Sequence, residues 1–172
     1  MKLVTDVHYF GEKRAAAAGL LFEDWTSPTP AAQVTNLMDQ VADYRPGRFF
    51  ERELPCLMGL LGTLEQMPDL IIVDGHAVLD DQGTPGLGTH LYHALGSTTP
   101  VIGVAKAAFA TAPPEAAVLR GGSQRALFVT ACGVDPATAR GWISSMHGPH
   151  RLPTLISAVD RLARDRAKNA SC

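Results

Sequence analysis

Two almost wholly apolar runs, residues 70–73 and 100–105, constrain the fold of this chain more than any other feature of its sequence. Neither run alternates apolar with polar residues, and such uninterrupted runs are typical of strands buried on both faces in the middle of a sheet. A helical pattern at residues 86–95 separates them, so we expect two neighbouring parallel strands joined by a helix. Asp74 follows the first run and Lys106 follows the second, which places these two charged side chains at the ends of adjacent buried strands.

The first part of the chain predicts antiparallel strands. Residues 2–10 alternate well enough for a strand, residues 11–14 form a polar turn, and residues 15–22 suit the returning strand of a hairpin. Residues 31–44 are ambiguous, because their alanines suit a helix whereas the stretch from Gln33 to Leu37 suits a strand. We favour a third strand in this segment.

The rest of the chain alternates between helical and strand patterns. Helices are predicted at residues 50–67, 86–95, 136–146 and 153–168, and the tail after Arg161 is expected to fray. Residues 116–119 and 126–129 flank a pair of glycines as a second hairpin. A chain of 172 residues fits one domain, 1–172. We therefore expect an α/β fold with an RNase H-like mixed sheet, in which three antiparallel strands precede parallel strands and helices cover both faces.

Three acidic residues occupy positions where a carboxylate is costly to bury. Asp6 interrupts the first strand, Glu53 lies at the start of a helical pattern, and Asp74 closes a buried strand. Burying such groups is unfavourable unless a cation or another partner compensates them. Clustered carboxylates are how many proteins hold Mg²⁺ for phosphoryl chemistry, so the pattern predicts a metal-dependent nuclease.

Each of these residues also has a purely structural interpretation. Asp6 can be a satisfied structural aspartate or protect an edge strand, and Glu53 can pair with Arg52 or cap its helix. Asp74 with Gly75 can be a plain turn. Lys106 can extend to solvent or stabilise the negative charge that builds on a reacting phosphate. Their combination favours function more strongly than any single member does.

Composition excludes several classes of protein. The formal net charge is −2, so the chain lacks the global basic field of strong nucleic-acid binders, and contacts to nucleic acid must be local. Cys56, Cys132 and Cys172 are too few and too scattered for a disulfide framework or a zinc site. Without a secretory or membrane-spanning pattern, we expect a cytoplasmic protein, with no membrane partner, that acts as a monomer.

A series of short motifs follows in one order along almost the whole chain. They are Asp6-Val7-His8-Tyr9, Tyr44-Arg45-Pro46-Gly47, Arg52-Glu53, Pro68-Asp69 leading to Val73-Asp74-Gly75, Gly86-Leu87-Gly88-Thr89-His90, residues 100–106 ending in Lys106, and Arg151-Leu152-Pro153 with Asp160 seven residues after the proline. In this order and spacing the chain resembles the endonuclease V family.

The resemblance implies an endonuclease that depends on Mg²⁺, for which Mn²⁺ substitutes, and that recognises deoxyinosine in DNA or inosine in RNA. It would hydrolyse the second phosphodiester on the 3′ side of the lesion, in DNA repair or in cleavage of inosine-containing RNA, and leave a 5′-phosphate. The residues that match the family's metal ligands are Asp6, Glu53, Asp74 and Asp160, with Lys106 assisting catalysis. Those that match its nucleic-acid contacts are Tyr44 and Pro46 as a wedge, Gly47, Arg52, and Gly75, His76 and Ala77 around the lesion base.

The chain departs from the family's pattern mainly around the lesion pocket. Ala77 replaces a glycine, Asp80 a histidine and Ser157 an arginine, and Thr130-Ala131-Cys132-Gly133 replaces a Ser-x-Gly-His stretch. If the Ala77 methyl faces the pocket, discrimination against ordinary bases should fall; if it faces away, only the loop is affected. Alternatives are an RNase H-like nuclease of broader or different substrate, a non-cleaving nucleic-acid-binding relative, and a phosphatase of small molecules. The retained acids and Lys106 argue against pure binding, because clustered negative charge repels phosphate.

Overall fold

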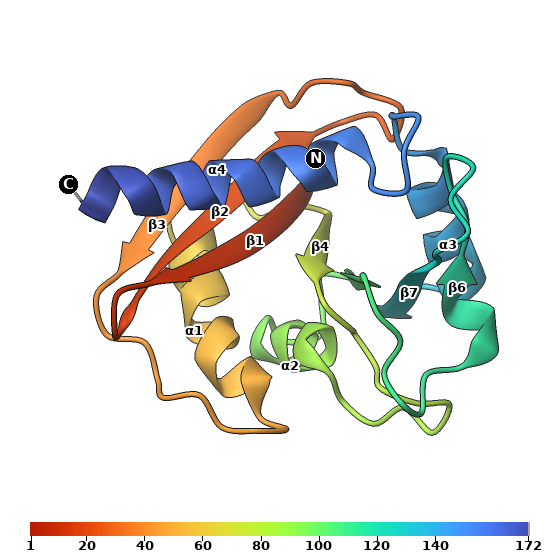
Figure 1. Ribbon diagram of the computed structural model, residues 1–172, viewed down its shortest axis with the longest axis horizontal. Coiled ribbons are helices and arrows are strands. Elements are labelled where there is room, and N and C mark those ends of the chain that lie inside the picture. Colours follow the sequence, from red (N-terminus) through yellow and green to blue (C-terminus); the bar gives the residue numbers. More distant parts are fainter. Residues whose placement is uncertain (172) are drawn as a thin grey trace.

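The computed structural model describes residues 1–171, so Cys172 lies outside the described residues. Within this range one mixed sheet of seven strands has the order β3-β2-β1-β4-β5-β7-β6 (Figure 1). The strands are β1 (Lys2–Phe10), β2 (Arg14–Phe22), β3 (Ala32–Met38), β4 (Leu70–Asp74), β5 (Val101–Ala105), β6 (Ala117–Val118) and β7 (Leu127–Cys132). The ambiguous segment 31–44 is therefore a strand in its first half, as predicted, but the strand ends at Met38 and the residues after it form a loop.

Strand directions divide the sheet into three parts. β1, β2 and β3 pair antiparallel, whereas β1, β4 and β5 pair in parallel. The apolar runs thus form the central parallel strands, which confirms the first expectation from the sequence. β7 returns antiparallel to β5 and pairs with the short β6, so the second predicted hairpin is also present.

Helices cover both faces of the sheet, as expected for an RNase H-like fold. They are α1 (Phe49–Leu61), α2 (Leu87–Ala94), α3 (Pro136–Ser145) and α4 (Thr154–Ser171), together with a short 3-10 turn, η1 (Pro114–Ala116). Alternate strand residues separate two cores: Val4 and Ile72 pack in the core with α3 and α4, whereas Leu3 and Ile71 pack in the core with α1 and α2. Within residues 1–171 no helix has both the length and the apolar character needed to cross a bilayer.

Two helix ends differ from the prediction. α1 stops at Leu61 rather than continuing to residue 67, and Gly62 forms its C-cap with an amide hydrogen bond to the Met58 carbonyl. α4 continues through Ser171 rather than fraying after Arg161. Its buried alanines, Ala163 and Ala167, pack against the sheet, and Arg14 Nη1 donates to the Ala170 carbonyl at 3.1 Å. Tertiary packing therefore orders the end of this helix, which its local sequence does not reveal.

Candidate metal and nucleic-acid site

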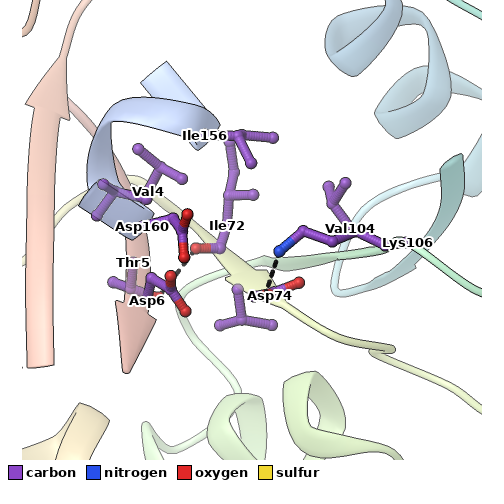
Figure 2. A pocket seen from close by; sticks show the side chains of 11 residues that line it. Val4, Thr5, Asp6, Ile72, Asp74, Val104, Lys106, Ile156 and Asp160 are labelled. Carbon is purple, nitrogen blue, oxygen red and sulfur yellow. Dashed lines mark hydrogen bonds and ion pairs between the residues drawn. The ribbon is translucent and has the colours of Figure 1, made fainter. Parts of the chain in front are cut away.

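The parallel pairing of β1 with β4 brings two carboxylates to the same end of the sheet. The register aligns Val4 with Ile72, and Asp6 and Asp74 each lie two residues further along. Thr5 Oγ1 donates to the Ile72 carbonyl at 3.0 Å, which joins the strands just before they diverge. Asp160 on α4 completes the acidic lining of the same pocket (Figure 2), because α4 packs across β1 and β2.

Two of the candidate metal ligands are buried. Asp6 is 8% exposed and Glu53, in the first turns of α1, is 4% exposed. Burial, and next the negative charge of Asp74, raise the pKa of Asp6 to about 6, although the Val7 amide opposes the shift. Burial, and next the charges of Asp6 and Asp74, raise the pKa of Glu53 well above its ordinary value. The carboxylates of Asp6, Glu53 and Asp74 thus lie close enough to repel one another.

The other carboxylates of the site pair with cationic side chains. Lys106, directly after β5, places its Nζ 3.1 Å from Asp74 Oδ2. Figure 2 marks this ion pair with a dashed line. Asp160 accepts a hydrogen bond from Arg164 on the next turn of α4. As these side chains lie, no three His, Cys, Asp or Glu residues within 1–171 form a ready ligand group. The oxygen donors and the uncompensated charge of the buried acids nevertheless suit a hard divalent cation.

The structural alternative for Glu53 is not realised. Arg52 does not pair with it; its guanidinium lies 4.0 Å from the centroid of the Tyr9 ring. Within residues 1–171 the buried Arg52 Nε has no hydrogen-bond partner. Glu53 does not cap the helix either, because the N-cap of α1 is Arg48. The nearby arginines Arg45 and Arg48 form ion pairs with Glu51 and not with Glu53. Glu53 is therefore a buried acid without a cationic partner among the described ion pairs.

The predicted wedge residues lie on an exposed loop between β3 and α1. Tyr44 is 61% exposed, and Pro46 and Gly47 are exposed beside it. Gly47 has a φ of +76°, a conformation that favours glycine. The Tyr44 ring therefore lies outside the core and is open to solvent.

The loop after β4 carries the residues predicted to surround the lesion base. Gly75 has a φ of +122°, and His76 Nε2 lies 3.1 Å from the Ala107 carbonyl. Burial lowers the pKa of His76. Ala77 is fully buried: its amide donates to Thr130 Oγ1 at 2.8 Å and its carbonyl accepts from Thr89 Oγ1 at 2.7 Å. Gly75 and His76 are thus the partly exposed members of this loop, and Ala77 is not.

Two glycines allow this loop to lie close to the sheet and to α2. A Cβ on Gly88 of α2 would lie 2.8 Å from the Ala77 Cβ, and one on Gly103 of β5 would collide with the Ala77 amide. The Ala77 methyl therefore points toward Gly88 in the interior. The methyl thus faces away from solvent, and we expect the case in which it also faces away from the lesion base.

Three contacts near the site could not be recognised in the sequence. Arg120 is 7% exposed and donates to backbone carbonyls between Ser144 and Arg151. Arg151 donates to the carbonyls of Lys106 and Ala126. Thr130 fixes the amide of Ala77. The acceptors of both arginines are main-chain atoms distant in sequence, and every residue type supplies a carbonyl. The motif comparison drew attention to Arg151 and to the stretch that begins at Thr130, but nothing in the sequence pointed to Arg120.

Known proteins resemble this chain in sequence and in fold. The model of the endonuclease V family matches residues 3–129. An endonuclease V of Rhodospirillum centenum is 32% identical over 131 residues, which are 64% of this chain and 53% of the relative. One from Nostoc is 29% identical over 177 residues, covering 89% of this chain and 76% of the relative. The chain spans about half the length of some curated relatives, for example 44% of one from Desulfurococcus amylolyticus.

Solved structures give the same result. The endonuclease V of Streptomyces avermitilis superposes with a TM-score of 0.81 at 28% identity, covering 99% of this chain and 82% of that one. Ciona intestinalis endonuclease V, in complex with a 24mer DNA containing an inosine followed by a ribo-adenosine, shares the fold with a TM-score of 0.79 at 18% identity, covering 98% of this chain and 86% of that one. Fold, motif order and family model agree, and the chain belongs to the endonuclease V family.

Proposed function

We propose that this chain is a Mg²⁺-dependent endonuclease that recognises deoxyinosine in DNA or inosine in RNA and hydrolyses the second phosphodiester on the 3′ side of the lesion. The observation that carries the proposal is the convergence of carboxylates from four elements beside one lysine: Asp6 on β1, Glu53 on α1, Asp74 on β4, Asp160 on α4, and Lys106 after β5. A member of the endonuclease V family with this set retains the groups that phosphodiester hydrolysis requires.

Asp6, Glu53, Asp74 and Asp160 would hold the cation, Mg²⁺ or Mn²⁺ in its place. Burial and mutual repulsion raise the pKa values of Asp6 and Glu53, so the ionised acids repel one another, and a divalent cation would relieve this repulsion. Such an ion, when bound, supplies an activated water and neutralises charge on the leaving oxygen. The fold contributes two rigid strands and two packed helices, which hold the oxygen donors in place.

Lys106 would act on the phosphate. Its ammonium contacts Asp74 at 3.1 Å, so it lies within reach of a phosphate oxygen at the same carboxylate cluster. A fixed ammonium beside developing negative charge lowers the barrier without reorganisation during the reaction.

The exposed loop and the turn after β4 would recognise the lesion. The Tyr44 ring with Pro46 and Gly47 fills the gap that an extruded base leaves in the stack. Gly75 and His76 line the entry to the base, and the buried Ala77 supports them from beneath. Arg52 keeps Tyr9 and the start of α1 in place beside the acids.

A substrate panel tests the proposal. Labelled single- and double-stranded DNA and RNA oligonucleotides with inosine, uracil, an abasic site or no lesion are incubated with Mg²⁺ or with a chelator. We expect Mg²⁺-dependent cleavage of inosine strands, with the 5′-phosphate product mapped to the second bond 3′ of the lesion. Equal cleavage of every substrate would indicate a broader nuclease, and binding without cleavage would indicate a non-catalytic relative.

A further inference from the structure

Lys106 lies just beyond the regular pairing of its strand. β5 ends at Ala105, which pairs with Phe128 as the last residue of the β5–β7 ladder. The Lys106 side chain is 43% exposed, so neither the sheet nor burial fixes where its ammonium lies. Asp74 Oδ2 contacts the ammonium at 3.1 Å, but a long, flexible lysine keeps one position only if a second contact holds its backbone.

Arg151 makes that contact with the main chain of Lys106. Its Nη2 donates to the Lys106 carbonyl and, at 2.7 Å, to the Ala126 carbonyl just before β7. One guanidinium therefore joins the ends of two adjacent strands at the point where the ladder stops. Hydrogen bonds from a charged donor are the stronger kind.

Arg151 is itself held by a second arginine. Arg120, which is buried, donates from Nη1 to the His150 carbonyl at 2.9 Å and to the Arg151 carbonyl at 3.3 Å. Its Nε donates to the Ser144 carbonyl at 3.3 Å, and its Nη2 donates to Met146. The connection between α3 and α4 is thus fixed along its length, and α4, which carries Asp160, begins at Thr154 immediately after it.

A separate contact holds the residue that follows Lys106. The Ala107 carbonyl lies 3.1 Å from His76 Nε2 in the loop after β4. The carbonyls of Lys106 and Ala107, two successive main-chain groups after the Lys106 Cα, are therefore held by side chains from different loops, Arg151 from one and His76 from the other. Together with the β5–β7 ladder, which holds the chain as far as Ala105, these contacts restrict the backbone from which the lysine extends.

We propose that Arg151 is a positioning residue that fixes Lys106 through its backbone carbonyl, and that Arg120 holds Arg151 for this task. The inference rests on the proposed function only in that Lys106 acts on the phosphate. Arg151 does not touch substrate; it reduces the positions open to the ammonium beside Asp74. Small displacements of a catalytic group cost large factors in rate.

A double-mutant cycle on the single-turnover cleavage rate separates positioning from general stability. Lys106→Met removes the ammonium but keeps the carbonyl that Arg151 contacts. Arg151→Met should lower the rate of the otherwise wild-type enzyme by about tenfold or more, with affinity for the inosine strand nearly unchanged. In the Lys106→Met background the same change should have almost no effect, because no ammonium remains to be misplaced. Equal losses in both backgrounds would overturn the inference.

Two further variants provide controls. Arg151→Lys keeps a cationic donor on a shorter side chain and should recover part of the rate, which also covers the case in which Arg151→Met folds poorly. Arg125→Met alters an exposed arginine one residue before Ala126. Arg125 contacts Ser123 through its main chain and not through its side chain, so the substitution keeps that contact. It should leave the rate unchanged.

Amide hydrogen exchange tests the same contact without reference to cleavage. Arg151→Met should speed exchange in residues 105–108 while β1 and α1 keep their protection. Faster exchange in Arg151→Met, together with no cleavage by the wild-type enzyme, would disprove the proposed nuclease function. It would still support the contact between Arg151 and the Lys106 carbonyl. Unchanged exchange at residues 105–108 would overturn the inference whatever the wild-type enzyme cleaves.

Discussion

At the scale of single residues, the site contains acidic side chains whose burial is energetically unfavourable. Asp6 and Glu53 are almost completely buried, and within the described ion pairs neither has a cationic partner. Lys106 and Arg164 compensate the more exposed acids, Asp74 and Asp160. This division predicts that the buried carboxylates, rather than the exposed ones, make the apo protein sensitive to pH.

The stability of the metal-free protein should fall as the pH rises. The pKa of Asp6 is about 6 in the folded chain, above its ordinary value of 3.8, so the folded state binds this proton more tightly than the unfolded state. The stabilisation is complete below the ordinary value and is lost as the pH rises through 6, by up to about 3 kcal/mol for a shift of this size. Urea unfolding in a chelator from pH 4 to pH 7 measures it. Asp6→Asn should flatten the dependence, and an unchanged slope would contradict the assignment.

The methyl of Ala77 should matter for stability and not for specificity. It is fully buried and points toward Gly88, so Ala77→Gly removes packing and loosens the loop. We expect a loss of about 1 kcal/mol in the free energy of unfolding, with the ratio of inosine to unmodified cleavage unchanged at matched metal and salt. A rise in that ratio would show that the methyl does reach the base.

At the scale of elements, apolar periodicity predicted most of the sheet and every helix. The runs at β4 and β5 have no polar residue to suggest an exposed face, and they form the parallel centre. The errors concern the ends of elements: α1 stops at Leu61, β3 stops at Met38, and α4 extends to Ser171 because Ala163 and Ala167 pack against the sheet. Local sequence does not specify packing partners, so it cannot locate such ends.

The loop between β3 and α1 should affect binding without affecting the fold. Tyr44 is 61% exposed, so Tyr44→Ala removes no core contact and should leave the thermal midpoint unchanged. Loss of one stacking ring should weaken binding to inosine strands by about 1–3 kcal/mol, and binding to unmodified duplex by less. Equilibrium titration of inosine-containing and unmodified DNA with catalytically inactive protein measures both losses of affinity. Equal losses on the two substrates would contradict a wedge.

At the scale of the whole molecule, the candidate site exists only in the folded chain. Asp6 of β1, Asp74 of β4 and Asp160 of α4 line one pocket, and the charges of Asp6 and Asp74 act on the buried Glu53 of α1. Motif order predicted this set of residues from the sequence. The Arg120 and Arg151 contacts were unpredictable, because their acceptors are backbone carbonyls that carry no residue identity.

Mg²⁺ should therefore stabilise the folded protein. A ligand that binds only the native state raises the apparent stability in proportion to the logarithm of its concentration. The thermal midpoint should rise with Mg²⁺ or Mn²⁺ in the wild type and in Asp81→Asn, an exposed acid outside the pocket. Asp160→Asn should reduce the shift. An equal shift in both variants would show that the ion binds elsewhere.

The most direct test of the central claim is single-turnover cleavage of an inosine-containing strand by Asp74→Asn beside the wild type and Asp81→Asn. The change at Asp74 removes one charge at nearly constant volume from the carboxylate that couples to Asp6, Glu53 and Lys106. We predict Mg²⁺-dependent cleavage by the wild type and by Asp81→Asn, and none by a folded Asp74→Asn protein. Full activity of Asp74→Asn at saturating Mg²⁺ would contradict the assignment of this carboxylate cluster as the catalytic metal site.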